Sequence, residues 1–159
     1  MPRKTTKALV REVQPDRLYN SVQVAKVINR VMQNGKKQMA EKLVYTGMEK
    51  AASRLKVENP LDVFEQALKN IQPGVETRSR RVGGANYQIP FEVKGQRQQH
   101  LTIMWFTQAA RARKGMSMAD RIAQELQDAY NNQGAAVKKR EDTHKMAEAN
   151  RAFAHFARG

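Results

Sequence analysis

Cysteine is absent from this chain of 159 residues, and its absence removes several chemistries at once. Without thiols there can be no disulfide, no thiolate nucleophile and no sulfur-ligated zinc site. The chain has only three histidines, which are scattered, and no isolated pair of carboxylates. Acid–base catalysis therefore lacks obvious candidates. We therefore predict that the protein is not an enzyme and holds no metal or other cofactor.

Long apolar runs are also missing. No segment approaches the roughly 20 apolar residues that a membrane-spanning helix needs. The basic N-terminus is not followed by an apolar stretch with a small-residue cleavage site, so we expect neither a secretory signal nor a membrane partner. The length fits a single domain over residues 1–159 with a core of ordinary size.

Acidic residues are few: 15 Asp and Glu stand against 29 Lys and Arg, giving a net charge of +14. Between Glu92 and Asp120 the chain contains no acid at all. The basic residues of that interval are Lys94, Arg97, Arg111, Arg113 and Lys114. An imbalance of this size is typical of proteins that bind a polyanion, and nucleic acid is the first candidate.

Helical periodicity dominates most of the chain. After a flexible basic arm over residues 1–18, apolar residues recur every three or four positions through 19–72 and again through 95–156. The sequence therefore predicts a mainly α protein with a six-helix, bundle-like body.

Local signals mark the ends of these helices. Asn59 is a good cap for the third helix and Ser117 for the fifth, while Gly134 is expected to close the fifth. Trp105 falls on the apolar face of the fourth helix, so we assign it to the core rather than to stacking on a base.

The stretch VETRSRRVGGANYQIPFEV, residues 75–93, breaks the helical pattern and predicts a two-stranded β-ribbon. Gly83 and Gly84 supply the bend, which needs positive φ. A lone pair of strands is marginally stable in water, so we expect the ribbon to project from the helices and to need a partner for its order. The arginines of its outgoing strand, whose guanidinium groups match phosphate oxygens, are Arg78, Arg80 and Arg81.

Charge alone does not separate RNA from DNA. A basic ribbon can enter a groove of DNA, so an architectural DNA-binding protein with a basic β-arm stays open as the alternative. Basic patches on the arm, the ribbon, the 111–114 turn and the 138–140 segment favour a folded RNA, which is recognised by its shape from several sides. RNA binding is therefore the leading hypothesis.

Three strings closely resemble one family: GKKQMAEKLVY, the residues 59–93 that include SRRVGG, and KREDTHKMAEANRAFAH. Over residues 19–156 the chain is similar to ribosomal protein seven of the small subunit, in its bacterial or organellar form. The resemblance implies a primary binder of small-subunit ribosomal RNA that nucleates assembly of the head. It further implies a position near the exit-site tRNA and the mRNA path in a cytoplasmic or organellar ribosome, beside ribosomal proteins nine and eleven of the small subunit.

The resemblance also assigns site residues by position. Those expected to contact ribosomal RNA are Arg3, Lys4, Arg78, Arg80, Arg81, Lys94, Arg97, Arg111, Arg113 and Lys114. Those expected near tRNA and mRNA are Arg80, Arg81, Gly83, Gly84, Lys138, Lys139, Arg140 and Arg151. Two positions depart from the family pattern: Met104 stands where many relatives have Arg, and the chain ends in HFARG instead of a common aromatic and basic ending.

Overall fold

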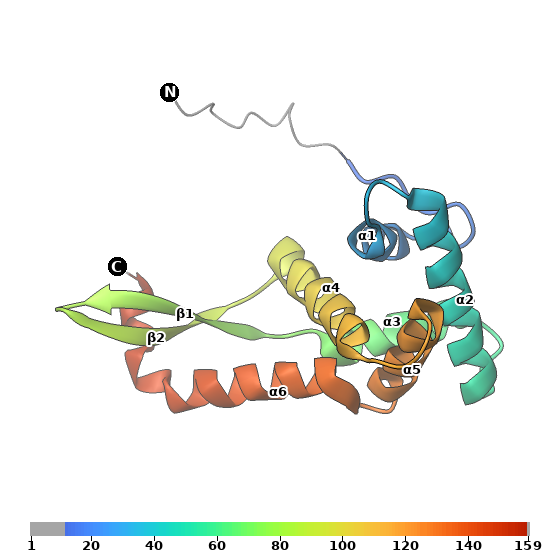
Figure 1. Cartoon of the computed structure of the whole chain (residues 1–159). Helices are drawn as coiled ribbons and strands as arrows, with labels where there is room; N and C mark the ends of the chain where they lie inside the picture. Colours follow the sequence, from blue (N-terminus) through green and yellow to red (C-terminus); the bar gives the residue numbers. More distant parts are fainter. Residues whose placement is uncertain (1–11, 159) are drawn as a thin grey trace, which may run out of the picture.

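The computed structural model of the chain describes residues 12–158 and is mainly helical (Figure 1). In chain order its elements are α1 (Val22–Val31), α2 (Lys37–Leu55), α3 (Pro60–Ile71), β1 (Val75–Val82), β2 (Ala85–Glu92), α4 (Gly95–Ala112), α5 (Met118–Tyr130), α6 (Gly134–Ala149) and the 3-10 helix η2 (Arg151–Arg158). The predicted fold class, helices interrupted by one β-ribbon, is confirmed. The arm residues Arg3 and Lys4 lie outside the described residues.

Helices α1 to α5 form the body around one apolar core. The largest side chains that are fully buried there are Phe64, Phe106, Ile28, Met48, Ile71, Ile122 and Leu126. Trp105 is also buried in this core, which confirms its assignment. Helices α2 and α5 pack closely at Gly47, where a Cβ atom would lie only 2.6 Å from Cγ2 of Ile122. In the part of the chain that the structure describes, no helix is long and apolar enough to span a bilayer.

Helix caps follow the local signals of the sequence. The side chain of Asn59 accepts the backbone N–H of Leu61 at the start of α3, and that of Ser117 accepts the N–H of Asp120 at the start of α5. Gly134 differs from the prediction, because α5 already ends at Tyr130 and Gly134 is the first residue of α6. Its φ of +92° is a conformation that glycine adopts without strain, and it turns the chain into α6.

Asp16 attaches the segment before α1 to the body. Its carboxylate accepts the backbone N–H groups of Leu18, Tyr19 and Ser21 and the hydroxyl of Tyr45 on α2. Burial by itself would raise the pKa of Asp16, but these hydrogen bonds outweigh it and hold the pKa below its ordinary value. The range 1–18 that the sequence suggested for an arm therefore includes a residue that is fixed on the body.

The ribbon extends away from the body, and α6 runs beside it (Figure 1). Its strands pair antiparallel from Val75 opposite Glu92 to Val82 opposite Ala85. Gly83 and Gly84 form the bend with φ of +57° and +86°, as predicted.

The C-terminal part of the same chain covers one side of the ribbon. The ring of Tyr87 on β2 lies 4.9 Å from that of Phe153 and 5.7 Å from that of Phe156, measured between centroids. On β1, the hydroxyl of Thr77 donates to Sδ of Met146 in α6 at 3.4 Å. The ribbon therefore has an internal partner, and we call β1, β2, α6 and η2 together the limb.

Candidate nucleic-acid interface

The basic side chains divide into two sets according to what they contact. An inner set donates to acidic side chains or backbone carbonyls of the protein itself, and an outer set points into solvent. Both sets contain residues that the sequence assigned to RNA contact.

Glu76 on β1 is the centre of the first inner group. It is buried at the base of the ribbon and accepts Nε and Nη2 of Arg97 on α4 at 3.0 and 2.8 Å. It also accepts Nε of Arg78 at 2.6 Å. Burial alone would raise the pKa of Glu76, but Arg97 and Arg78 outweigh it and lower the pKa. These contacts fix the base of the ribbon to the body.

Glu125 on α5 organises the second inner group. It is fully buried and accepts Nε and Nη2 of Arg113 at 3.0 and 2.7 Å, while Asp128 accepts the same Nη2 at 2.5 Å. The other carboxylate oxygen of Glu125 accepts the backbone N–H of Ala136, in the first turn of α6, at 3.1 Å. Burial would lower the pKa of Arg113, but the two carboxylates outweigh it and raise the pKa. This group joins α5 to the limb.

Two further arginines bind the carbonyl ends of helices. Nη2 of Arg111 donates to the carbonyl of Arg30 at 3.0 Å, at the end of α1. Nη1 of Arg140 donates to the carbonyl of Asn70, at the end of α3. Carbonyl groups in the last helical turn have no partner within the helix, and a cation there also suits the helix dipole. Arg111 therefore links α4 to α1, and Arg140 links α6 to α3.

The strand register separates the three arginines of the ribbon. Arg78 lies opposite Ile89 and Arg80 opposite Tyr87, so both arginines share the face that carries the apolar side chains. Arg80 donates to the carbonyl of Phe156 in η2 at 3.1 Å. Arg81 belongs to the opposite face of the ribbon and is exposed.

The outer cations that the sequence assigned to nucleic acid lie along the limb and at the turn between α4 and α5. They are exposed, and within residues 12–158 their side chains make no ion pair or hydrogen bond: Arg81, Lys114, Lys138, Lys139 and Arg151. Lys94 pairs with Glu92 at 2.8 Å, but both side chains are mostly exposed, so water competes strongly with this contact. Gly83 and Gly84 at the tip are exposed as well. Permanently charged groups on a fixed frame can bind phosphate without first breaking an internal pair.

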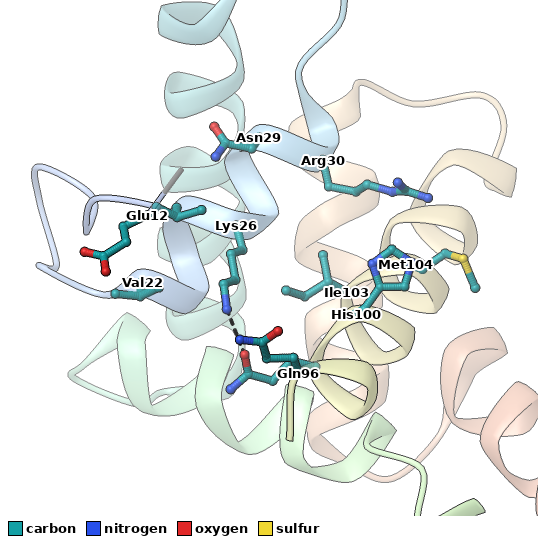
Figure 2. A pocket seen from close by; sticks show the side chains of 11 residues that line it. Glu12, Val22, Lys26, Asn29, Arg30, Gln96, His100, Ile103 and Met104 are labelled. Atoms are coloured by element: carbon teal, nitrogen blue, oxygen red, sulfur yellow. Dashed lines mark hydrogen bonds between the residues drawn. The ribbon is translucent and has the colours of Figure 1, made fainter. Parts of the chain in front are cut away.

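A cleft of about 670 Å³ separates α1 from α4. Figure 2 shows Lys26 and Arg30 on the α1 side and Gln96, His100 and Met104 on the α4 side. Nζ of Lys26 donates to Oε1 of Gln99 at 2.8 Å across its floor. The walls combine two cations, Lys26 and Arg30, with the carboxylate of Glu12, amide side chains and several apolar residues. No grouping of His, Asp and Glu in the described part of the chain is arranged to hold a metal.

Comparisons with known proteins identify the family of this chain. The family model described as "Ribosomal protein S7p/S5e" matches residues 2–151. The chain belongs to this family. The resemblance found in the sequence is thereby confirmed.

Relatives in this family match the chain over nearly its whole length. The protein named "Small ribosomal subunit protein uS7" from Pelagibacter ubique is 54% identical over 156 residues, which is 98% of this chain and 99% of the relative. Proteins of the same name are 56% identical over 146 residues in Symbiobacterium thermophilum and 53% identical over 150 residues in Thermosipho melanesiensis. Their alignments cover 92% and 94% of this chain, and 93% and 96% of the relatives.

The sequence of this S7-family chain reveals the basic residues but not their division into two sets. Glu76 and Arg78 are two residues apart on one strand, and this spacing is a signal that the two side chains share a face. The α1–α4 cleft has no comparable signal, because its walls come from segments about 70 residues apart in the chain. Met104, the position that departs from many relatives, lies in the wall of this cleft (Figure 2).

Proposed function

We propose that this chain is a structural protein of the small ribosomal subunit that binds the ribosomal RNA of that subunit directly and nucleates assembly of its head. The observation that carries the proposal is the outer set of cations on a frame whose other arginines are held internally. Counterion release from phosphates drives such binding, and a rigid cationic surface suits a folded RNA. The names of the relatives support the ribosomal part of the proposal.

The limb is the part that we assign to the exit site. We propose that the ribbon tip, with Arg80, Arg81, Gly83 and Gly84, lies near the mRNA path, and that α6 and η2 present Lys138, Lys139, Arg140 and Arg151 toward the exit-site tRNA. Arg140 would contribute only the donors left over from its contacts with Asn70, Asn132 and Glu141. Ribosomal proteins nine and eleven of the small subunit are the proposed neighbours, in a cytoplasmic ribosome or, as the alternative, an organellar one.

A salt titration tests the RNA contact. Binding of the full chain to transcribed small-subunit ribosomal RNA should weaken linearly with the logarithm of salt concentration. Arg81→Ala should lower that slope by about 1, because one phosphate contact is lost. Lys69→Ala is the matched control, since Lys69 is an exposed cation on α3 that no prediction assigns to RNA. An equal slope for Arg81→Ala and the parent chain would remove Arg81 from the interface.

Competition and deletion separate the remaining alternatives. Duplex DNA at equal phosphate concentration should leave the RNA complex intact, whereas efficient displacement would favour the architectural DNA-binding protein.

Replacing residues 78–89 by a short Gly-Ser link preserves Glu76 and its bond to Arg97. Subunits that carry this deletion should assemble but mishandle tRNA or mRNA. Normal handling of both would remove the exit-site role.

A further inference from the structure

The chain contains a single Asn–Gly pair, Asn34–Gly35, in the turn between α1 and α2. Asparagine before glycine readily loses its side-chain amide, because glycine has no Cβ to hinder the approach of its backbone nitrogen to Cγ of the asparagine. The next most reactive pair is Asn20–Ser21, since the small serine hinders this approach only a little. Both asparagines are exposed, and both have a φ of +51°. The two sites therefore differ mainly in their hydrogen bonds.

The reacting atom at each site is the backbone nitrogen of the following residue. At Ser21 the N–H donates to Oδ1 of the buried Asp16 at 2.8 Å. A hydrogen bond to a carboxylate holds this nitrogen in place and opposes the removal of its proton. The N–H of Gly35, in contrast, has no hydrogen-bond partner within residues 12–158, and neither has the side chain of Asn34. Both reacting groups are therefore available at Asn34.

The surroundings of the turn also favour the reaction. A Cβ atom added at Gly35 would meet no atom within 4 Å, so the space around this residue is open. The turn contains the exposed bond from the N–H of Lys36 to the carbonyl of Gln33 at 3.0 Å, and such a bond opens locally at little cost. Lys36 and Lys37 are exposed cations, and positive charge nearby stabilises a deprotonated amide.

We propose that Asn34 is a site of spontaneous deamidation and the asparagine that reacts fastest in the folded chain. Hydroxide removes the proton of the Gly35 N–H, and the nitrogen forms a bond to Cγ of Asn34. The bond from Cγ to Nδ2 then breaks, and ammonia leaves after taking a proton from water. Water opens the five-membered imide at one of its two carbonyl groups, which gives aspartate or isoaspartate.

The product places a carboxylate at the entrance to α2. Position 34 lies two residues before Lys36, the N-cap of α2, whose side chain makes no capping hydrogen bond. A negative charge near the start of a helix suits the helix dipole, so α2 should stay folded after the reaction. Each event removes one unit from the net charge of +14. The deamidated chain should therefore leave a cation exchanger earlier than the parent chain.

Kinetics at each asparagine, in the folded and the unfolded chain, test this inference. The full chain, free of RNA, is incubated at mildly alkaline pH with and without guanidinium chloride at a concentration that unfolds it. Peptide mass spectrometry measures the conversion of each amide to an acid, and an isoaspartate-specific methyltransferase identifies the isomer. The unfolded chain supplies the reference rate that the sequence alone sets.

Folding should affect the two sites differently. We expect folding to change the rate at Asn34 by less than about threefold and to slow Asn20 at least about tenfold, because the bond from Ser21 to Asp16 must open first. Equal slowing at both sites would overturn the proposal. A faster reaction at any other asparagine of the folded chain would overturn it as well.

Replacing the asparagine itself provides a second measurement. Asn34→Gln should remove the species that first appears in cation-exchange chromatography, because glutamine must close a larger six-membered ring. Asn29→Gln is the matched control, since Asn29 is an exposed asparagine inside α1, and it should leave that species unchanged. Persistence of the species in Asn34→Gln would overturn the proposal.

Removing the carboxylate at the protected site tests the physical cause. Asp16→Ala frees the N–H of Ser21 and should raise the rate at Asn20 at least about fivefold, while the rate at Asn34 stays the same. An unchanged rate at Asn20 would overturn the hydrogen-bond basis of the proposal. Every measurement uses the free chain, so the result does not depend on the proposed function.

Discussion

The body and the limb are stabilised by different forces. In the body, aliphatic and aromatic side chains of α1 to α5 are buried on one another, with Phe64, Phe106 and Leu126 essentially inaccessible to water. In the limb, Ile89 is the only large apolar side chain of the ribbon that is fully buried among the described residues. The ribbon depends on the carboxylate of Glu76 and on half-exposed aromatic rings.

This difference shows how a protein with an excess of cations can extend a limb from its core. A two-stranded ribbon has too little apolar surface to be stable alone. Here two buried carboxylates, Glu76 and Glu125, join the limb to the body. Glu76 pairs with Arg78 and Arg97, which would otherwise repel each other, and Glu125 pairs with Arg113. Substitutions that remove one kind of contact at a time should therefore affect the body and the limb differently.

Removing a core ring should affect the body far more than the limb. Phe64→Ala leaves a cavity among α-helices and should lower the free energy of unfolding by about 4 kcal/mol. Phe91→Ala removes a half-exposed ring of the ribbon that lies against Arg78 and should cost about 1 kcal/mol. Urea unfolding of both variants measures the contrast. Equal losses would mean that the ribbon shares the body core.

Removing the carboxylate that joins α5 to α6 should come next in size. Glu125→Ala leaves Arg113 with Asp128 alone and frees the N–H of Ala136, so we expect a loss of about 3 kcal/mol in urea unfolding. Glu65→Ala, an exposed position on α3, is the control and should change the value by less than about 0.5 kcal/mol. A loss below 1 kcal/mol for Glu125→Ala would contradict the structural role given to Arg113.

Acid should weaken the attachment of the ribbon through Glu76. The pKa of Glu76 is lower in the folded state than its unfolded value of about 4.3. The contribution of its ion pairs to the free energy of unfolding is therefore complete above that value. The contribution is then lost as pH falls through the folded pKa. Glu76→Gln should therefore cost about 2 kcal/mol at pH 7 and progressively less toward pH 3.

Melting temperatures of both proteins from pH 7 to pH 3 measure this convergence. Glu92→Gln, which removes an exposed ion pair, should remain close to the parent at pH 7. Parallel curves for Glu76→Gln and the parent would exclude the proposed linkage. Asp16 also has a lowered pKa, so the Glu76→Gln variant itself should still lose some stability in acid.

The smallest global effect is expected at the ribbon tip. Phe156→Ala removes one ring of the cluster that covers Tyr87 and should change the global free energy of unfolding by about 1 kcal/mol or less. Local opening should nevertheless increase, which hydrogen exchange of the β2 amides near Tyr87 would detect. Exchange of the amides of Val27 and Ile28 should not change. Unchanged β2 exchange would show that η2 does not hold the ribbon.

Local chemistry made much of the fold predictable. The cap at Asn59, the bend at Gly83 and Gly84 and the burial of Trp105 each depend on a few neighbouring residues. The position of Gly134 was predicted wrongly, because a glycine with positive φ can end one helix or begin the next, and only the packing against Asp128 and Glu125 decides between them.

The sequence by itself determined that the chain is helical, strongly basic and a member of one family, because composition, periodicity and motifs are properties of the chain. Only the tertiary structure decided which cations serve the fold and which face outward. Arg97 and Glu76 are 21 residues apart, and Arg113 and Glu125 are 12 apart, so their pairing exists only after folding. The strength of an ion pair depends on the distance between the two charges and on their burial. Neither quantity can be read from the order of the residues.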